Sequence, residues 1–207
     1  MKIFNADGPI YKFFYNLIAL IEINFFWAIC SLPLVTLGGA TIAAYDVCMK
    51  LQEGNEGHVV KDFFRSFKSN FKNGIPYGLL LLVCCYVVWL DFSLFNQIEG
   101  NPIILLIMGI IAAAVFLVCF LFAFALQARY ENTFLRTLKN SADISMRYFL
   151  RTLTLLIVLA VQVFLYFWNT YTLILFAILG PACMMYTVSA YARHFFALIE
   201  KDNGKVA

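Results

Sequence analysis

Five long runs of apolar residues dominate this sequence and restrict the folds open to it. The runs comprise residues 10–32, 75–95, 102–126, 152–168 and 172–196. Because the hydrocarbon layer of a bilayer is about 30 Å thick, a helix of roughly 20 apolar residues crosses it. Apolar residues make up 63% of the chain and charged residues 13%, whereas soluble domains have about 45–50% and about 25%. We therefore expect an all-α, polytopic transmembrane helical bundle of about five spans, with residues 1–207 forming a single membrane domain.

Basic residues are concentrated on alternate connections between these runs. The clusters are Lys50, Lys61, Arg65, Lys68 and Lys72; then Arg129, Arg136, Lys139, Arg147 and Arg151; and finally Arg193, Lys201 and Lys205. Multi-spanning proteins keep such loops in the cytoplasm. With five spans, the pattern predicts a multi-pass protein of the cell membrane whose N-terminus is outside and whose C-terminus is cytoplasmic. The lipid bilayer is the expected partner, and the aromatic residues belong to the apolar runs rather than to a nucleic-acid surface.

The segment 34–49 is the ambiguous part of this topology. It is less apolar than the five runs, and it could lie at the membrane surface, re-enter the membrane or cross it. We favour a short helix at the inner face because Gly38, Gly39 and Asp46 precede Lys50. A crossing would give six spans and would move the N-terminus inside. The small-residue pairs Gly39/Ala43 and Ala40/Ala44 favour close helix packing over a substrate path.

Residues 60–72 have the clearest amphipathic pattern between the runs. The apolar side comprises Val60, Phe63, Phe64, Phe67 and Phe71, and the basic side comprises Lys61, Arg65, Lys68 and Lys72. Such a pattern predicts a helix in the headgroup region, and docking onto a partner would give the same pattern.

The third run continues without a helix breaker as far as Asn140 and Ser141. We expect one helix from residue 102 to 138 that projects into the cytoplasm, with Ser141 capping the next helix. The two extensions would form a cytoplasmic helical hairpin. Its basic residues Arg129, Arg136 and Arg147, together with helix 60–72, are the predicted partner or lipid-contact surface.

Three polar residues within the runs form a candidate intramembrane site. Glu22 lies near the middle of the first run, with Asn24 beside it, and Gln162 lies in the fourth. A carboxylate at that depth is costly, so Glu22 indicates either a proton- or substrate-linked site or an interhelical hydrogen bond. Gly180-Pro181 predicts a kink in the fifth run, either static or acting as a hinge.

Enzyme signatures are absent from the sequence. It has no nucleophile elbow, no phosphate-binding glycine loop and no His or carboxylate constellation for a metal. We therefore expect no catalytic residues, no cofactor and no metal, and a protein that is not an enzyme.

Two blocks of the sequence carry a family resemblance. The first is Asn24-x-x-Trp27 followed by residues 31–40 (SLPLVTLGGA) and Ala43-Ala44, and the second is residues 60–72. These blocks resemble the YesL family of bacterial integral membrane proteins. The likeness continues loosely through 128–140, and Gly39 stands where many members have proline. The family has no established activity, but its members occur beside genes for carbohydrate ABC importers and polysaccharide degradation. The resemblance therefore implies an accessory or regulatory role in carbohydrate ABC import, with importer subunits as partners. The alternative is a small-solute (sugar) transporter or channel with a polar path near Glu22.

Overall fold

The computed structural model describes residues 8–55, 57–97, 103–130 and 132–203, and these residues form helices and connections without a strand. The elements are α1 (Pro9–Ser31), η1 (Leu34–Thr36), α2 (Leu37–Gln52), α3 (Val59–Gln97), α4 (Ile103–Phe120), α5 (Ala123–Arg129), α6 (Phe134–Arg147), α7 (Phe149–Tyr166) and α8 (Thr170–Asn203). Within the described ranges, six segments are long and apolar enough to cross a membrane. The expected all-α fold of membrane-length helices is confirmed. Pro102 and Lys205 lie outside the described residues.

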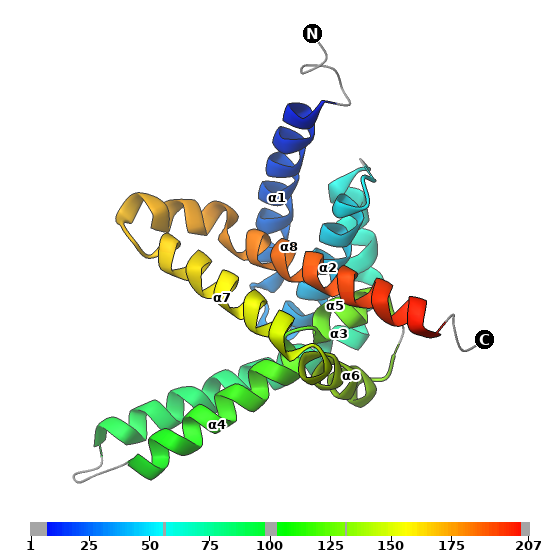
Figure 1. Cartoon of the computed structure of the whole chain (residues 1–207). Coiled ribbons are helices and arrows are strands. Elements are labelled where there is room, and N and C mark those ends of the chain that lie inside the picture. Colours follow the sequence, from blue (N-terminus) through cyan, green and yellow to red (C-terminus); the bar gives the residue numbers. More distant parts are fainter. Residues whose placement is uncertain (1–7, 56, 98–102, 131, 204–207) are drawn as a thin grey trace.

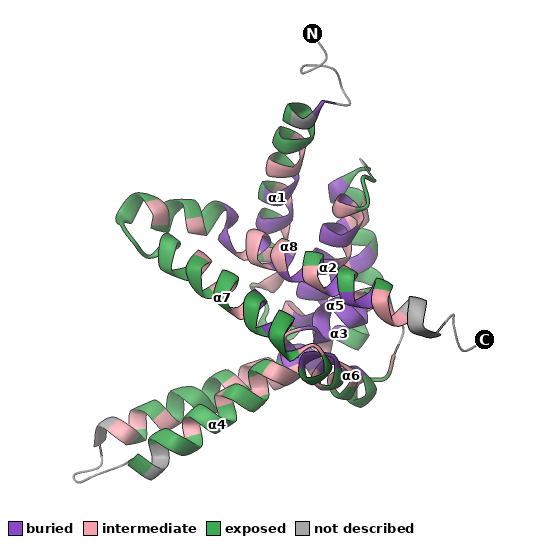
Figure 2. Cartoon of the chain, viewed as in Figure 1, coloured by how far each residue is buried: buried purple, intermediate pink, exposed green. Residues whose placement is uncertain are grey.

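Two helical hairpins extend from a common centre in different directions (Figure 1). The second part of α3 pairs with α4 in one hairpin, and α7 pairs with the first part of α8 in the other. Both hairpins are exposed over most of their length, whereas buried residues gather where the helices meet (Figure 2). The exposed side chains include Trp89, Ile110 and Phe164. Large apolar side chains on the outside of a helix suit contact with lipid.

Helix α2 lies at the centre of the molecule and corrects the prediction for residues 34–49. It is a 16-residue helix rather than a short surface helix. It packs against α1, α3, α5 and α8, and most of its residues are buried. The segment is less apolar than the other runs because it is rich in glycine and alanine. These small residues let neighbouring helices approach closely.

The contact between α2 and α3 depends on glycines from both helices. A Cβ atom on Gly38 would overlap the carbonyl of Gly74, and one on Gly74 would overlap the backbone of Gly39. A Cβ on Gly78 would lie 2.9 Å from the backbone nitrogen of Gly38. Backbones this close leave no room for side chains. Gly38 therefore allows the close approach of the two helices, and the predicted pairs Gly39/Ala43 and Ala40/Ala44 are buried in the same helix.

The start of α1 lies beside the connection that precedes α3. The Tyr15 hydroxyl donates a hydrogen bond of 2.9 Å to the carbonyl of Gly57. Helices α1 and α2 therefore run in opposite directions, and the chain returns to the end at which α1 began. The five-span prediction placed these two segments at opposite ends. The difference arises because α2, which that prediction left at the membrane surface, is a full helix.

Residues 60–72 and 75–95 were predicted as two elements, but they belong to one 39-residue helix, α3. Pro76 lies inside this helix, which changes direction where it leaves α2 (Figure 1). At about 1.5 Å per residue, the helix is roughly 58 Å long. The predicted interfacial helix is therefore continuous with a membrane-length helix and is not a separate element.

The helix predicted from residue 102 to 138 is interrupted, so the projecting cytoplasmic hairpin does not form. Helix α4 ends at Phe120, and α5 lies in the core between α2, α6 and α8. In a continuous helix the N–H of Phe122 would bond the carbonyl of Val118. Here that N–H donates to Ser141 Oγ at 3.2 Å, and Ser145 Oγ donates to the Val118 carbonyl at 3.1 Å. Ser141 therefore lies within α6 and joins it to the break, instead of capping a helix.

Candidate functional site

The candidate site begins at the C-terminal end of α2, where acidic Glu53 meets two of the three basic clusters. Its Oε1 lies 3.6 Å from Arg129 Nη1, at the end of α5, and 3.6 Å from Arg193 Nε on α8. These side chains are about one-third exposed. Each ion pair contributes at most about 1 kcal/mol at such exposure. The ion pairs mainly determine geometry: they bring the end of α2, the end of α5 and the Arg193 region of α8 together on one surface.

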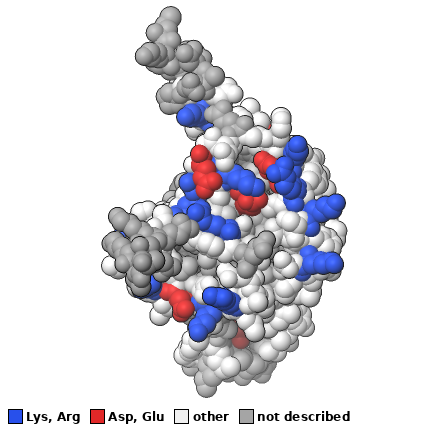
Figure 3. Space-filling model, turned by 90° about the vertical axis from the view of Figure 1, so that its right-hand side faces the viewer, with Lys and Arg blue, Asp and Glu red and all other residues white. Residues whose placement is uncertain are grey.

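This surface carries lysines and arginines from several parts of the chain. Figure 3 shows them spread over one face, with fewer acidic residues among them. We call this surface the basic face; it contains Arg129, Arg136, Arg147, Arg151 and Arg193. Arg151 Nη1 lies 3.0 Å from Nε2 of His194. Because a guanidinium can only donate, Nε2 accepts and the ring proton is on Nδ1. This contact joins the start of α7 to α8.

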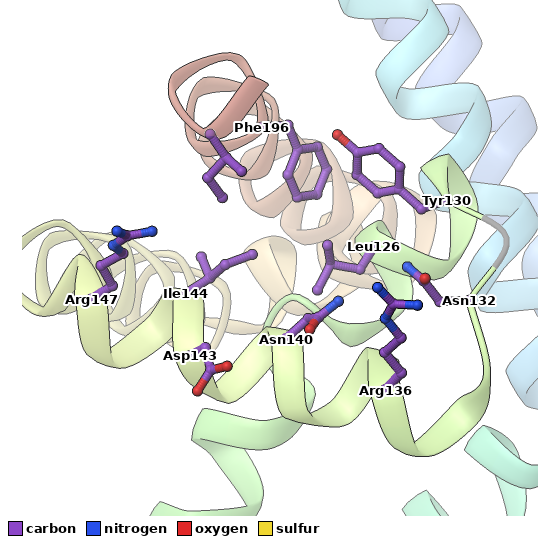
Figure 4. Close-up of a pocket in the computed structure, with 10 residues that line it drawn as sticks. Leu126, Tyr130, Asn132, Arg136, Asn140, Asp143, Ile144, Arg147 and Phe196 are labelled. Carbon is purple, nitrogen blue, oxygen red and sulfur yellow. The ribbon is translucent and has the colours of Figure 1, made fainter. Parts of the chain in front are cut away.

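A groove opens between α6 and α8 on the basic face. Its volume is about 430 Å³, and its floor is formed by Leu126, Ile144, Phe196 and Ile199. Its polar rim comprises Tyr130, Asn132, Arg136, Asn140, Asp143 and Arg147. Figure 4 shows Phe196 and Tyr130 on one side, facing the helix that carries the arginines, with the Asp143 carboxylate turned away from them. The groove therefore combines an apolar floor with a rim that favours negative charge.

Aromatic rings and a buried polar network hold the groove in shape. The guanidinium carbon of Arg129 lies 5.9 Å from the ring centroid of Tyr130 and 5.7 Å from that of Phe196. In the interior, Gln127 Oε1 accepts hydrogen bonds from the Tyr77 hydroxyl (2.8 Å) and Thr137 Oγ1 (3.1 Å). Those three side chains come from α5, α3 and α6 and are buried. A satisfied buried network of this kind rigidifies the elements it joins.

The phenylalanine side of residues 60–72 is only partly available for contact. Phe63 is fully buried, and its ring centroid lies 6.1 Å from that of Phe26 on α1. Phe67 is half-buried and lies close to Gly39. Phe64 and Phe71 remain exposed. Part of the predicted contact face is therefore used for packing against α1 and α2.

The basic side of the same segment is accessible. Arg65, Lys68 and Lys72 are all exposed. Arg65 Nη1 lies 3.8 Å from Asp62 Oδ1, one turn earlier on α3. These cations lie on the surface of α3 and are available to phosphates or to an acidic partner.

The three polar residues predicted as an intramembrane site do not line one path. Asn24 Nδ2 donates to the carbonyls of Ala177 and Ile178 on α8, at 2.9 and 3.0 Å. Gln162 Nε2 donates to Thr187 Oγ1 at 3.0 Å and joins α7 to α8. Glu22 instead lines a separate cleft of about 450 Å³, together with His58 and Lys61. Asn24 and Gln162 therefore serve helix packing.

Sequence reasoning did not find Glu53, Phe196 or the Gln127 network. Glu53 is an acidic residue three positions after Lys50 of the first basic cluster, and this was the available signal. Phe196 and Gln127 lie in apolar stretches and give no separate signal. Their roles depend on α5 folding back into the core, which the apolar pattern did not indicate.

Comparison with known proteins gives one partial match. A family described as "Protein of unknown function, DUF624" matches residues 20–92, from α1 into the second part of α3. No curated protein and no solved structure matches the chain. The matched stretch includes α2 and residues 60–72, and it ends before the helices that form the groove. Over residues 20–92 the chain is similar to the DUF624 family, and as a whole it is a multi-pass helical membrane protein.

Proposed function

We propose that this protein is a non-catalytic accessory or regulatory component of a carbohydrate ABC importer and that it binds the importer through its basic face. The proposal rests on one observation: Glu53 forms ion pairs with Arg129 and Arg193, and these pairs lie beside a preformed groove. An apolar floor with a basic rim suits an acidic, amphipathic segment of another protein. The choice of a carbohydrate importer rests on the YesL resemblance, with which the DUF624 match is consistent.

The orientation of the chain is part of this proposal. Basic loops stay in the cytoplasm, so the basic face and the groove would be cytoplasmic. Since Tyr15 contacts Gly57, the start of α1 would be on the same side. Six spans would then place both ends of the chain in the cytoplasm. This replaces the outside N-terminus of the five-span prediction.

The solute-path alternative is not favoured by the geometry. A path would need Glu22, Asn24 and Gln162 to face a common opening. The amide nitrogens of Asn24 and Gln162 instead bond to different parts of α8, and Glu22 lies in a cleft at the start of α3.

Affinity purification tests the docking proposal. The tagged protein, at native expression and in mild detergent, should recover importer subunits that mass spectrometry identifies. Arg136→Glu should reduce recovery by about tenfold or more, because like charges across an interface are costly. The matched control Lys12→Glu makes the same charge change away from the groove. Size-exclusion chromatography checks that both variants remain folded.

Two results would contradict the proposal. The first is recovery of the wild-type protein alone. The second is an equal loss of importer subunits in the groove variant and its control, which would indicate only a general charge effect.

A further inference from the structure

Helix α6 carries two strongly exposed apolar side chains, one near each end, with partly covered apolar positions between them. Leu135 is 76% exposed and Met146 is 66% exposed. Leu138 and Ala142 are half-buried and lie between them. The four positions follow one another by 3, 4 and 4 residues, so they form a single stripe along the helix. The adjacent side of α6, with Thr137, Ser141 and Ser145, packs into the core.

A membrane crossing does not account for this stripe. Helix α6 has only 14 residues, among which are Arg136, Lys139, Asp143 and Arg147. It therefore cannot cross the hydrocarbon layer, which needs about 20 apolar residues. Its basic residues lie between the apolar stripe and the buried side. An apolar stripe beside a basic one is typical of a helix in the plane of the headgroups.

The junction between α6 and α7 supports the same position. The chain turns at Tyr148, whose φ and ψ are −111° and 43°, and α7 then begins a membrane-length segment. Figure 1 shows α6 lying across the direction of α7. The first residues of α7 include Phe149 and Leu150, which are both exposed. The stripe of α6 is therefore continuous with the apolar surface of a candidate span.

A cleft of about 520 Å³ lies at this junction. It is lined by Arg147, Tyr148, Phe149, Leu150, Arg151 and Leu198. The two arginines, one at the end of α6 and one in the first turn of α7, match a phosphate group, and the apolar side chains beside them match the first part of an acyl chain. His194 holds the Arg151 side chain from α8. A soluble anion would leave the apolar part of this cleft unused.

We propose that α6 lies in the headgroup layer, with Leu135 and Met146 in lipid, and that Arg147 and Arg151 bind the headgroup of an anionic phospholipid. The lipid then fixes the position of the basic groove relative to the membrane. This site does not depend on the importer, so it holds or fails separately from the proposed function.

Lipid retention tests the headgroup site. The full-length protein, reconstituted in mixed phosphatidylglycerol and phosphatidylcholine, should retain phosphatidylglycerol preferentially in native mass spectrometry. Since each basic side chain near an anionic surface is worth about 1 kcal/mol, Arg147→Gln/Arg151→Gln should lower that retention by about fivefold for each arginine. The control Lys12→Glu makes the same change in net charge away from the cleft and should retain the lipid. Excess glycerol phosphate should not displace it.

Three results would overturn this headgroup site. Unchanged retention in the arginine variant would show that the cleft does not bind the lipid. An equal loss in the control would indicate diffuse attraction to the basic face. Displacement by glycerol phosphate would assign the cleft to a soluble anion.

Photolabelling tests the position of α6 without any mutation. Phosphatidylglycerol with a diazirine in its acyl chain should label peptides that contain Leu135 or Met146, as well as those of α7. Labelling of α7 alone would contradict a position in lipid. The same would be true if light scattering showed a dimer that Met146→Glu dissociates, because the stripe would then be a subunit interface.

Discussion

The amide of Asn24 in α1 supplies a hydrogen bond that Pro181 cannot supply in α8. Asn24 Nδ2 donates to the carbonyl of Ala177 at 2.9 Å. In a regular helix this carbonyl would accept the N–H of residue 181, but proline has none. The bond therefore satisfies a backbone group that would otherwise be unpaired where water is scarce.

Replacing Asn24 by alanine should destabilise the protein by about 1–2 kcal/mol, because the Ala177 carbonyl loses its partner. Unfolding in mixed micelles with increasing dodecyl sulfate measures this change. The control is Asn16→Ala, at a half-buried position on the same helix where the described residues show no side-chain hydrogen bond. If the two variants were equally stable, the Asn24 bond would not contribute to the fold.

The break between α4 and α5 predicts that the protein loses stability when the two serines that bond to it are removed. Ser141→Ala/Ser145→Ala should leave the Phe122 N–H and the Val118 carbonyl without their partners on α6. Each unpaired buried group costs about 1–3 kcal/mol, so the double variant should unfold at a clearly lower temperature than wild type. Ser69→Ala is the control, because the Ser69 hydroxyl bonds only within its own helix, to the Ser66 carbonyl. An unchanged unfolding temperature would mean that water or a helical bond replaces the serines.

Adjacent glycines in α2 should respond differently to the same substitution. Gly38→Ala should prevent the close approach of α2 and α3, because its Cβ would overlap the carbonyl of Gly74. Gly39→Ala places a Cβ no closer than 3.5 Å to its neighbours, which is an ordinary contact. We therefore expect Gly38→Ala to reduce the yield of monodisperse protein and Gly39→Ala to leave it near wild type. Similar yields for both variants would contradict the glycine contact.

The sequence predicted the class of fold well because lipid exposure leaves a strong signal. A helix surrounded by lipid needs a long apolar run, and the runs of α4, α7 and α8 have one. Helix α2 faces other helices, and close packing selects glycine and alanine instead of large apolar residues. Its lower hydropathy therefore led to the wrong prediction of a surface helix. Because α2 is buried among other helices, it lacks the strongly apolar run by which hydropathy identifies a membrane span.

The helix boundaries were harder to predict because they depend on distant partners. Nothing between residues 102 and 138 indicates a break after Phe120, and the serines that stabilise it follow about 20 residues later. Conversely, residues 60–72 and 75–95 were predicted as separate elements, although α3 continues through Asn73 and Gly74. For the site, the cluster that contains Arg129, Arg136 and Arg147 was found from charge alone. That these arginines share one surface with Glu53 could not be predicted from the sequence, because it depends on how the helices pack.

Cysteine labelling in intact cells tests most directly whether the basic face and the start of α1 share the cytoplasmic side. Single cysteines would replace Lys12, Asn55, Lys139 and Asn169, which are all exposed, and the wild-type protein would give the background from its six native cysteines. A membrane-impermeant maleimide should label position 169 in intact cells, and positions 12, 55 and 139 only after the membrane is opened. Labelling of position 12 from outside would restore the five-span topology. Labelling of position 55 or 139 from outside would contradict a cytoplasmic basic face.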